Sequence, residues 1–278
     1  MTDTVLSRAS LEELLRFYAE AGVDEALDDA PVNRFASAKP EPAPAPAPTP
    51  QLDPQAPREP NAVRPPAPSI VATVPDEAQA ARAREAARSA ATLDELREIL
   101  AGFDGCNLKF TAKSLVFADG NPAAPIMFVG EAPGREEDIE GLPFVGRSGQ
   151  LLDRMLAAIG LDRTNAYIAN VLPWRPPGNR DPSPMETEIC RPFIERQIEL
   201  VAPKVLVTLG NASSKALLRT QTGIMRLRGG WKTHTLGDGR EIPLMPTLHP
   251  AYLLRNPAHK KLAWRDLLEI KAKLRSLG

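Results

Sequence analysis

The feature that most constrains the fold is an alternation of short apolar runs and amphipathic stretches that begins after Pro125. Apolar runs of this length, bounded by loops, are typical of strands buried on both faces, and they lie at 126–130, 166–171, 204–210 and 242–249. Helical patterns lie between or after them, at 148–159, 184–201, 211–218 and 259–276. Such an order predicts an α/β fold, a three-layer αβα domain with a mostly parallel central sheet.

A proline-rich tract precedes this domain. Of the 29 prolines, 13 lie between Pro40 and Pro75, where they alternate with alanine and few large apolar side chains occur. Such a segment cannot bury enough surface to offset its ordering entropy, so we predict a disordered linker over 36–75. Residues 1–35 are predicted to form a short helical segment, and the domain to cover 76–278.

Two helices are predicted to open the domain. The first is an Ala- and Arg-rich stretch at 76–90. The second begins at Thr92 in "TLDEL", where Glu95 completes a capping box, and it ends near Gly102.

The charge distribution is uneven although the net charge is only -1. Residues 224–278 hold 11 Lys and Arg against 4 Asp and Glu, a balance of +7. This fits a local polyanion-binding face, although many solvated surfaces have a similar balance. No apolar run approaches the roughly 20 residues of a membrane span, and the start of the chain has no signal segment. The sequence therefore predicts a cytoplasmic protein that does not contact membranes.

Polar side chains follow the four predicted strands: Glu131, Asn170, Asn211 and His249. Because the carboxyl ends of parallel strands meet at one edge of a sheet, we expect these residues to converge there. The Gly-rich turn after the first strand lacks the GxxxxGK[ST] pattern, and the acidic run 136–138 would repel phosphate. A neutral ligand with hydrogen-bonding groups, such as a nucleobase, suits this edge better.

Three motifs extend these strand ends: "GEAPGREEDIEGLPFVGRSGQLL" (130–152), "NVLPWRPPGNRDPSP" (170–184) and "HPAYLLRNP" (249–257). With them the chain, from about residue 102 to 278, resembles the family 4 uracil-DNA glycosylases of bacteria and archaea. The resemblance implies a uracil-DNA glycosylase-like fold and a base-excision repair enzyme that flips uracil out of DNA and hydrolyses its bond to the sugar. No motif indicates a lysine nucleophile, so a monofunctional glycosylase that leaves an abasic site is expected.

The resemblance implies four uracil-binding residues. Phe144 would stack on the flipped base, and Asn170 would read its pairing edge, because one amide offers both a donor and an acceptor. His249 would bind O2, where negative charge develops, and Ala132 would contact the base through its backbone. Three of them have a purely structural alternative: Phe144 in the core, Asn170 as a turn residue, and His249 as a buried histidine with protein partners.

The residue that positions the attacking water is less directly indicated. Ala132 stands where other glycosylase families carry Asp or Asn. We predict that Glu137 holds the water, with Glu131 as the second candidate, since a carboxylate can orient water and stabilise an oxocarbenium-like sugar. The acidic run that contains Glu137 could instead be a helix entry or a solvated surface.

DNA contacts are expected from the same motifs. The resemblance places Leu253 where related enzymes insert an apolar wedge into the stack, although Leu253 could also pack inward with Leu254. The predicted phosphate-binding cations are Arg175, Arg180, Arg255 and Lys260. The first two could instead pair with local carboxylates.

The sequence departs from the family at its iron-sulfur ligands. Family 4 enzymes carry four cysteines that hold a 4Fe-4S cluster; Cys106 and Cys190 match two of them, whereas Phe103 and Trp174 occupy the other two positions. We therefore predict that the cysteines are remnants of a ligand set, that Phe103 and Trp174 pack near them in a dry cluster, and that the protein holds no metal. The alternative is a 4Fe-4S cluster completed by unusual ligands or by a partner.

The expected partner is uracil-containing DNA, in a bacterial, nucleoid-associated monomer whose N-terminal helix could contact another protein. Two rival interpretations remain at this point. One is a non-hydrolytic DNA-binding or polymerase-associated module of the same fold, and the other is a glycosylase that prefers another deaminated base.

Overall fold

The computed structural model describes residues 77–277. The predicted helical segment 1–35 and linker 36–75 lie outside the described residues.

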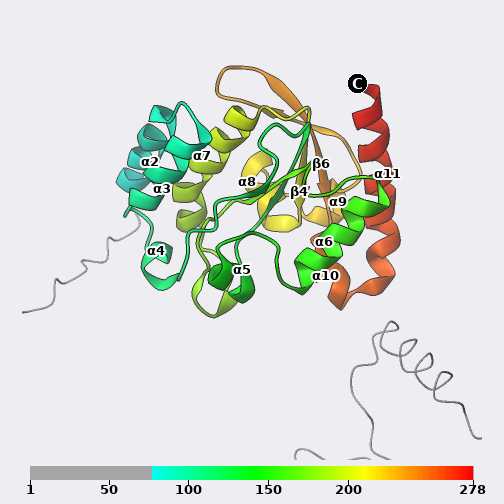
Figure 1. The fold of residues 1–278 in the computed structure, drawn as a ribbon, viewed down its shortest axis with the longest axis horizontal. Helices are drawn as coiled ribbons and strands as arrows, with labels where there is room; N and C mark the ends of the chain where they lie inside the picture. The colour runs from blue at the N-terminus through cyan, green and yellow to red at the C-terminus, as the bar shows by residue number, and fades with distance from the viewer. Residues whose placement is uncertain (1–76, 278) are drawn as a thin grey trace, which may run out of the picture. The chain divides into compact units, whose positions relative to one another are not determined.

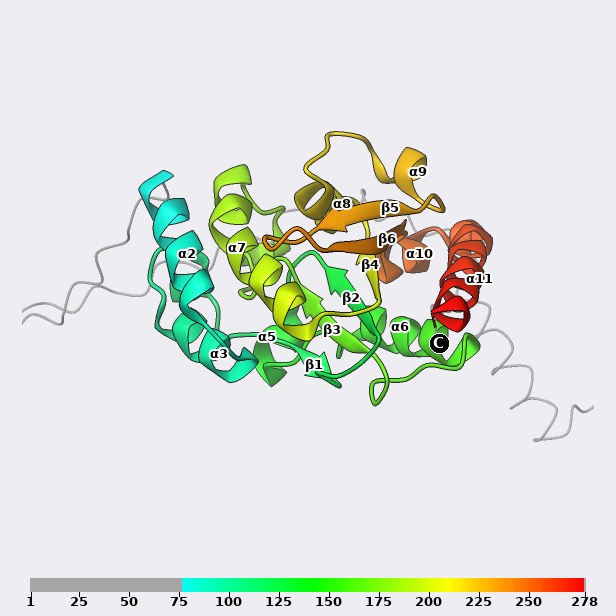
Figure 2. The ribbon, with the colours of Figure 1, turned by 90° about the horizontal axis from the view of Figure 1, so that it is seen from above.

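A six-stranded sheet in the order β1-β3-β2-β4-β6-β5 forms the centre of the fold (Figures 1 and 2). Its four inner strands are mutually parallel, as predicted: β2 (Ile126–Gly130), β3 (Tyr167–Asn170), β4 (Val205–Leu209) and β6 (Glu241–Thr247). The edge strands β1 (Asp119–Gly120) and β5 (Lys232–Thr235) are antiparallel and were not predicted. In β5 only His234 is buried, so this strand has no apolar run to indicate it.

Helices cover both faces of the sheet, which confirms the three-layer αβα prediction (Figure 2). Met127 and Val129 of β2 pack in one core cluster, whereas the alternate residues Ile126 and Phe128 pack in the other. The first cluster lies under α2 (Glu77–Ser89), α3 (Leu93–Gly102), α7 (Pro184–Val201) and α8 (Asn211–Leu218). The second lies under α6 (Arg147–Ala158), α10 (Pro250–Arg255) and α11 (Lys260–Ser276).

The predicted helices begin and end within one residue or so of their observed bounds. Thr92 caps α3 by accepting a hydrogen bond from the Glu95 N–H at 3.2 Å, as predicted. The Glu95 carboxylate accepts from the Ala91 N–H rather than from that of Thr92. The sequence offered α5 (Arg135–Glu140) only as the helix-entry alternative for the acidic run. It did not indicate the other short helices: α4 (Leu108–Thr111), α9 (Ile224–Leu227), α10 (Pro250–Arg255), η1 (Pro177–Asn179) and η2 (Pro257–His259). Over residues 77–277, no helix combines the length and apolar character that crossing a bilayer requires.

Candidate active site

A cleft of about 970 Å³ lies at the carboxyl edge of the parallel strands. Four residues at or just after the carboxyl ends of the inner strands all line it: Glu131, Asn170, Asn211 and His249. The predicted convergence of strand ends is therefore confirmed. This volume is near the upper end of the roughly 300–1,000 Å³ typical of small-molecule sites, so the cleft can admit more than one base.

Asn170 is the last residue of β3 and is only 6% exposed. Its side-chain amide makes no hydrogen bond with any other residue in 77–277, which leaves its donor and acceptor available to a ligand. Gly130 lets the amide lie here, because a Cβ at that position would come within 2.4 Å of the Asn170 Oδ1 and 2.6 Å of the Phe144 ring. The amide and the ring are thus held together across a glycine.

Phe144 belongs both to the core and to the cleft. Its side chain packs in the cluster under α6, yet the residue also lines the cleft, and its ring centroid lies 5.6 Å from that of His249. The two rings are tilted by 30° to each other. The core alternative and the stacking role are therefore compatible, because the ring can be fixed by packing and still present a surface to the cleft.

His249 caps the N-terminus of α10, where Pro250 occupies the first helical position. The Ala251 N–H donates a hydrogen bond to His249 Nδ1 at 3.1 Å. Because Nδ1 is an acceptor, the proton of the neutral ring lies on Nε2. Burial, with a smaller effect from the Arg255 charge, lowers the pKa of His249 to about 4. The ring is therefore a neutral N–H donor at physiological pH.

Glu131 follows β2 directly and is half-buried in the wall of the cleft. Burial, and next the charge of Asp181, raise the pKa of Glu131 above the usual value for a glutamate. The neighbouring Ala132 also lines the cleft. No hydrogen bond within residues 77–277 engages the Glu131 carboxylate, so it can accept one from water or a ligand.

Glu137 does not have the surroundings expected of the main water ligand. It is 6% exposed, and its Oε2 accepts from the Gly134 N–H at 3.0 Å as the carboxylate of a capping box at α5. Its Oε1 accepts from the N–H groups of Val145 and Gly146 at 3.1 and 3.0 Å. These three backbone bonds give Glu137 a structural position at a helix entry, which was the alternative in the sequence, and they favour Glu131 for the water.

The wedge prediction for Leu253 needs correction. Leu253 is 1% exposed and packs in the core beneath α10, so it cannot reach DNA without unpacking the helix. Leu254, its neighbour, is 37% exposed and lines the cleft. The sequence could not separate the two, because both are leucines in a motif too short for a helical period to appear.

The predicted cations fall into two groups. Arg180 forms two hydrogen bonds with Glu186, at 2.9 and 2.6 Å, and Arg175 lies 3.9 Å from an oxygen of Asp138 and binds the Asn179 side chain. Both arginines therefore pair with nearby carboxylates, which was the alternative to a phosphate contact in the sequence analysis. Arg255 and Lys260 are exposed, and Arg255 lines the cleft. Two further exposed arginines at the cleft had no sequence signal beyond their charge: Arg135 and Arg147.

The four positions that correspond to cluster ligands lie in one buried region. Cys106 and Cys190 are fully buried with their Sγ atoms 3.8 Å apart, and Phe103 and Trp174 belong to the same apolar cluster. The Cys106 thiol next to it and burial raise the pKa of Cys190.

Within 77–277, no three His, Cys, Asp or Glu side chains are grouped as a metal site would require. These residues do not fit a cluster that takes four thiolates.

Comparison with known proteins gives a consistent result. The family model of the uracil DNA glycosylase superfamily matches residues 117–268. A type-4 uracil-DNA glycosylase of Sulfurisphaera tokodaii is 40% identical over 188 residues, which is 65% of this chain and 84% of the relative. Those of Saccharolobus solfataricus and Archaeoglobus fulgidus are 42% and 41% identical, over 62% and 60% of this chain and 81% and 85% of the relatives.

Proposed function

Because this chain belongs to the uracil-DNA glycosylase superfamily, and within it to the type-4 enzymes, we propose that the cleft at the strand ends is where it excises uracil from DNA. The protein is a hydrolase of N-glycosyl bonds that acts in DNA repair. The observation that supports the cleft as its site is that an unengaged amide, an aromatic ring and a neutral imidazole donor all border it. Release of uracil from a uracil-containing oligonucleotide by the full-length protein tests this proposal, and no release from single strands, G:U or A:U pairs would overturn it.

Recognition rests on three side chains that contact different parts of the base. The Asn170 amide donates to O4 and accepts from N3–H of uracil, a pattern that cytosine reverses. The Phe144 ring stacks on the face of the base, and a flipped base enters this space only after leaving the DNA stack. The backbone at Ala132 borders the same space and would complete the contact.

Bond cleavage then depends on charge that develops in opposite directions on base and sugar. As the C1′–N1 bond breaks, its electron pair leaves with the base, and His249 Nε2–H stabilises the charge on O2. The sugar becomes oxocarbenium-like, and the Glu131 carboxylate stabilises it and orients the attacking water. As the water oxygen bonds to C1′, Glu131 accepts the proton that the water loses. Glu131 acts here in place of Glu137, since its carboxylate is the one without protein partners.

The pH dependence follows from the raised pKa of Glu131. The ionised form is the active one, so activity should fall as the pH drops through the pKa of Glu131, at a higher pH than for an ordinary glutamate. His249, with its pKa at about 4, should not contribute to this decline. Excision rates measured from pH 5 upward, where His249 stays neutral, should show one acidic decline in the wild type. Glu131→Gln should be slower and lose that decline, whereas an unchanged profile in this variant would remove Glu131 from the chemistry.

DNA binding in this proposal involves exposed residues around the cleft. Four cations contact phosphates: Arg135, Arg147, Arg255 and Lys260. Leu254 takes the wedge role that was predicted for Leu253. A wedge fills the gap left by the flipped base and offsets the few kcal/mol of unstacking.

Leu254→Ala should therefore slow excision from duplex DNA more than from single-stranded DNA, where no stack has to be held open. Leu253→Ala should instead lower the melting temperature, because it leaves a cavity in the core. Comparing both variants on both substrates checks this assignment. An equal loss on single and double strands for Leu254→Ala would contradict a wedge.

The buried cysteine region is proposed to hold no iron-sulfur cluster. Phe103 and Trp174 occupy apolar positions where thiolate ligands would be needed. The Phe103 ring packs edge-on against that of Phe193, with 5.1 Å between the ring centroids. Anaerobically purified protein should then contain no stoichiometric iron and show no visible absorption from a cluster. Cys106→Ala together with Cys190→Ala should retain excision activity. Stoichiometric iron that is lost in the double variant would show that unusual ligands complete a cluster.

A further inference from the structure

Phe144 has a backbone conformation that a bulky residue rarely adopts. Its φ is 55°, in the left-handed region that glycine favours. Ala202 and Arg219 also have positive φ, but both are the C-caps of helices, where this conformation is common. Phe144 ends no helix, so its conformation must be imposed by its surroundings.

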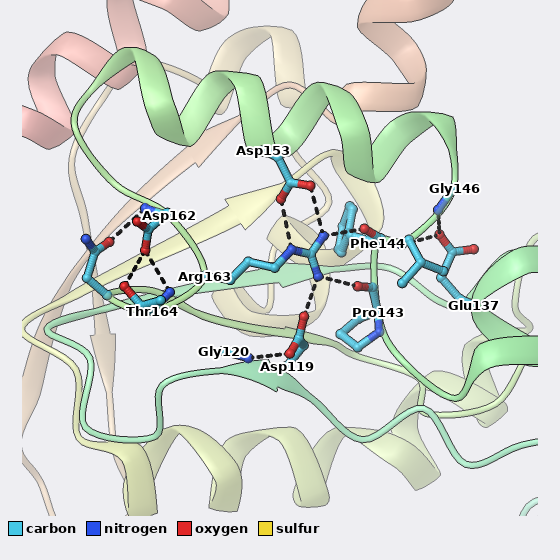
Figure 3. A network of polar contacts seen from close by, with 12 residues as sticks. Asp119, Gly120, Glu137, Pro143, Phe144, Gly146, Asp153, Asp162, Arg163 and Thr164 are labelled. Atoms are coloured by element: carbon cyan, nitrogen blue, oxygen red, sulfur yellow. Dashed lines mark hydrogen bonds and ion pairs between the residues drawn. The ribbon is translucent and has the colours of Figure 1, made fainter.

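Arg163, in the loop between α6 and β3, contacts the backbone at this point from one side (Figure 3). Its Nη1 donates to the Pro143 carbonyl at 3.1 Å, and its Nη2 donates to the Phe144 carbonyl. A guanidinium presents its N–H groups in a rigid planar fork, so it can hold two successive carbonyls in one orientation.

Two carboxylates orient the guanidinium itself. Asp119 on β1 accepts from Nη1 at 2.5 Å, and Asp153 on α6 accepts from Nε at 2.9 Å (Figure 3). Side chains from β1 and α6 therefore fix the guanidinium independently of its contacts with the loop that contains Phe144. Charge-assisted bonds of this kind are the stronger hydrogen bonds in proteins.

The opposite side of the same loop is held by Glu137, which accepts from the N–H groups of Val145 and Gly146. Gly149 closes the remaining side, because a Cβ there would lie 1.7 Å from the Phe144 carbonyl oxygen. Carbonyls on one side and N–H groups on the other are thus both engaged, and the intervening residue has little freedom to relax.

We propose that Arg163 is a positioning residue for uracil excision, which acts by holding Phe144 in the left-handed conformation that presents its ring to the flipped base. This inference rests on the proposed role of Phe144 and extends it to a residue that does not line the cleft. Arg163 touches neither DNA nor base in this account. Its effect on the reaction passes through the orientation of one aromatic ring.

A double-mutant cycle tests this, with single-turnover excision measured for the full-length wild type, Arg163→Lys, Phe144→Leu and the double variant. Lysine keeps the charge but loses the fork, so Arg163→Lys should slow excision about 10–100-fold, as expected for a small misplacement of a positioning group. In the Phe144→Leu background the same change should cost less than about twofold, because the ring that it orients is absent. The DNA concentration for half-saturation should stay nearly constant.

The matched control is Arg154→Lys, an exposed arginine of α6 that has no ion pair within residues 77–277, and it should leave the rate unchanged. If Arg163→Lys does not fold, as judged by thermal unfolding, Asp119→Asn weakens the same anchor more gently and should show the same non-additivity. An unchanged rate in the folded variant, or an equal loss in both backgrounds, would overturn the inference. Failure of the proposed function is a separate result, since the wild type itself would then release no uracil.

Discussion

Asn170→Ala should lower the rate of uracil excision by about two to four orders of magnitude, the largest effect that we expect from a single change. A site built to hydrogen-bond a polar edge discriminates by factors of up to about 10⁴–10⁵, because an unmatched polar group left in it loses its partner. Asn170 is nearly buried and its amide has no partner in residues 77–277, so little in the protein can replace it.

Asn170→Asp refines this expectation. A carboxylate keeps the size of the side chain but has no N–H to donate to O4 of uracil. It should therefore lose most uracil activity, and any remaining activity should move toward cytosine, whose N4 amino group is a donor. Single-turnover assays on uracil- and cytosine-containing strands check both variants. Near-normal uracil excision by Asn170→Ala would remove this residue from recognition and with it the main argument for the cleft.

The fold was predictable from the sequence wherever an apolar run or an amphipathic stretch was long enough to identify a strand or a helix. The four parallel strands and the main helices follow from buried runs and amphipathic stretches, since burial on both faces of a sheet produces continuous apolar segments. The edge strand β5 was not predicted, because three of its four residues are exposed and only His234 is buried. Short helices such as α5 and α10 were not predicted, because one or two turns are too short to show a helical repeat of apolar residues.

The site was predictable in part, for a related reason. The carboxyl ends of parallel strands converge by topology, so the sequence alone places Asn170 and His249 at the same edge of the sheet. The roles of Glu137 and Leu253 could not be decided, because each depends on which way a side chain turns in a short helix. Arg163 had no signal at all, since a single arginine in a loop gives no indication of the carbonyls it will contact.

The residues proposed to contact the base and the residues that hold the loop in place have different surroundings. The groups proposed to contact the base are set on a strand end, a helix cap and the loop before α6. The groups that fix this loop direct their hydrogen bonds to the backbone: Glu137 accepts three backbone N–H bonds, and Arg163 donates to two carbonyls and to two carboxylates. A charged side chain engaged in this way is well suited to hold a strained loop and poorly suited to exchange protons with water. In the proposed mechanism, this division leaves Glu137 as a structural carboxylate and the half-buried Glu131 as the one available for chemistry.

His249→Ala should reduce excision by about 10²–10³-fold, the loss expected when one donor to a developing negative charge is removed. The geometry specifies which donor can act: the Ala251 N–H donates to Nδ1, so only Nε2–H is left to donate to the base. Because the pKa of His249 is lowered to about 4, the imidazole should act in its neutral form, and the rate of Glu131→Gln, which lacks the Glu131 decline, should show no change near pH 6.5, where an exposed histidine titrates. His234→Gln, on the edge strand β5 and outside the cleft lining, is the control.

Two measurements check the role of His249 together: single-turnover rates across pH, and the titration of the His249 ring followed by NMR. A ring that titrates near 6.5, together with a rate that rises as the ring is protonated, would contradict a neutral donor and would indicate that an imidazolium stabilises the leaving base. A low pKa with an unimpaired His249→Ala variant would instead leave O2 without a side-chain donor. The expected pair of results, a low pKa and a large loss, would mean that burial and a backbone hydrogen bond together keep this histidine uncharged and aimed at the atom where charge accumulates.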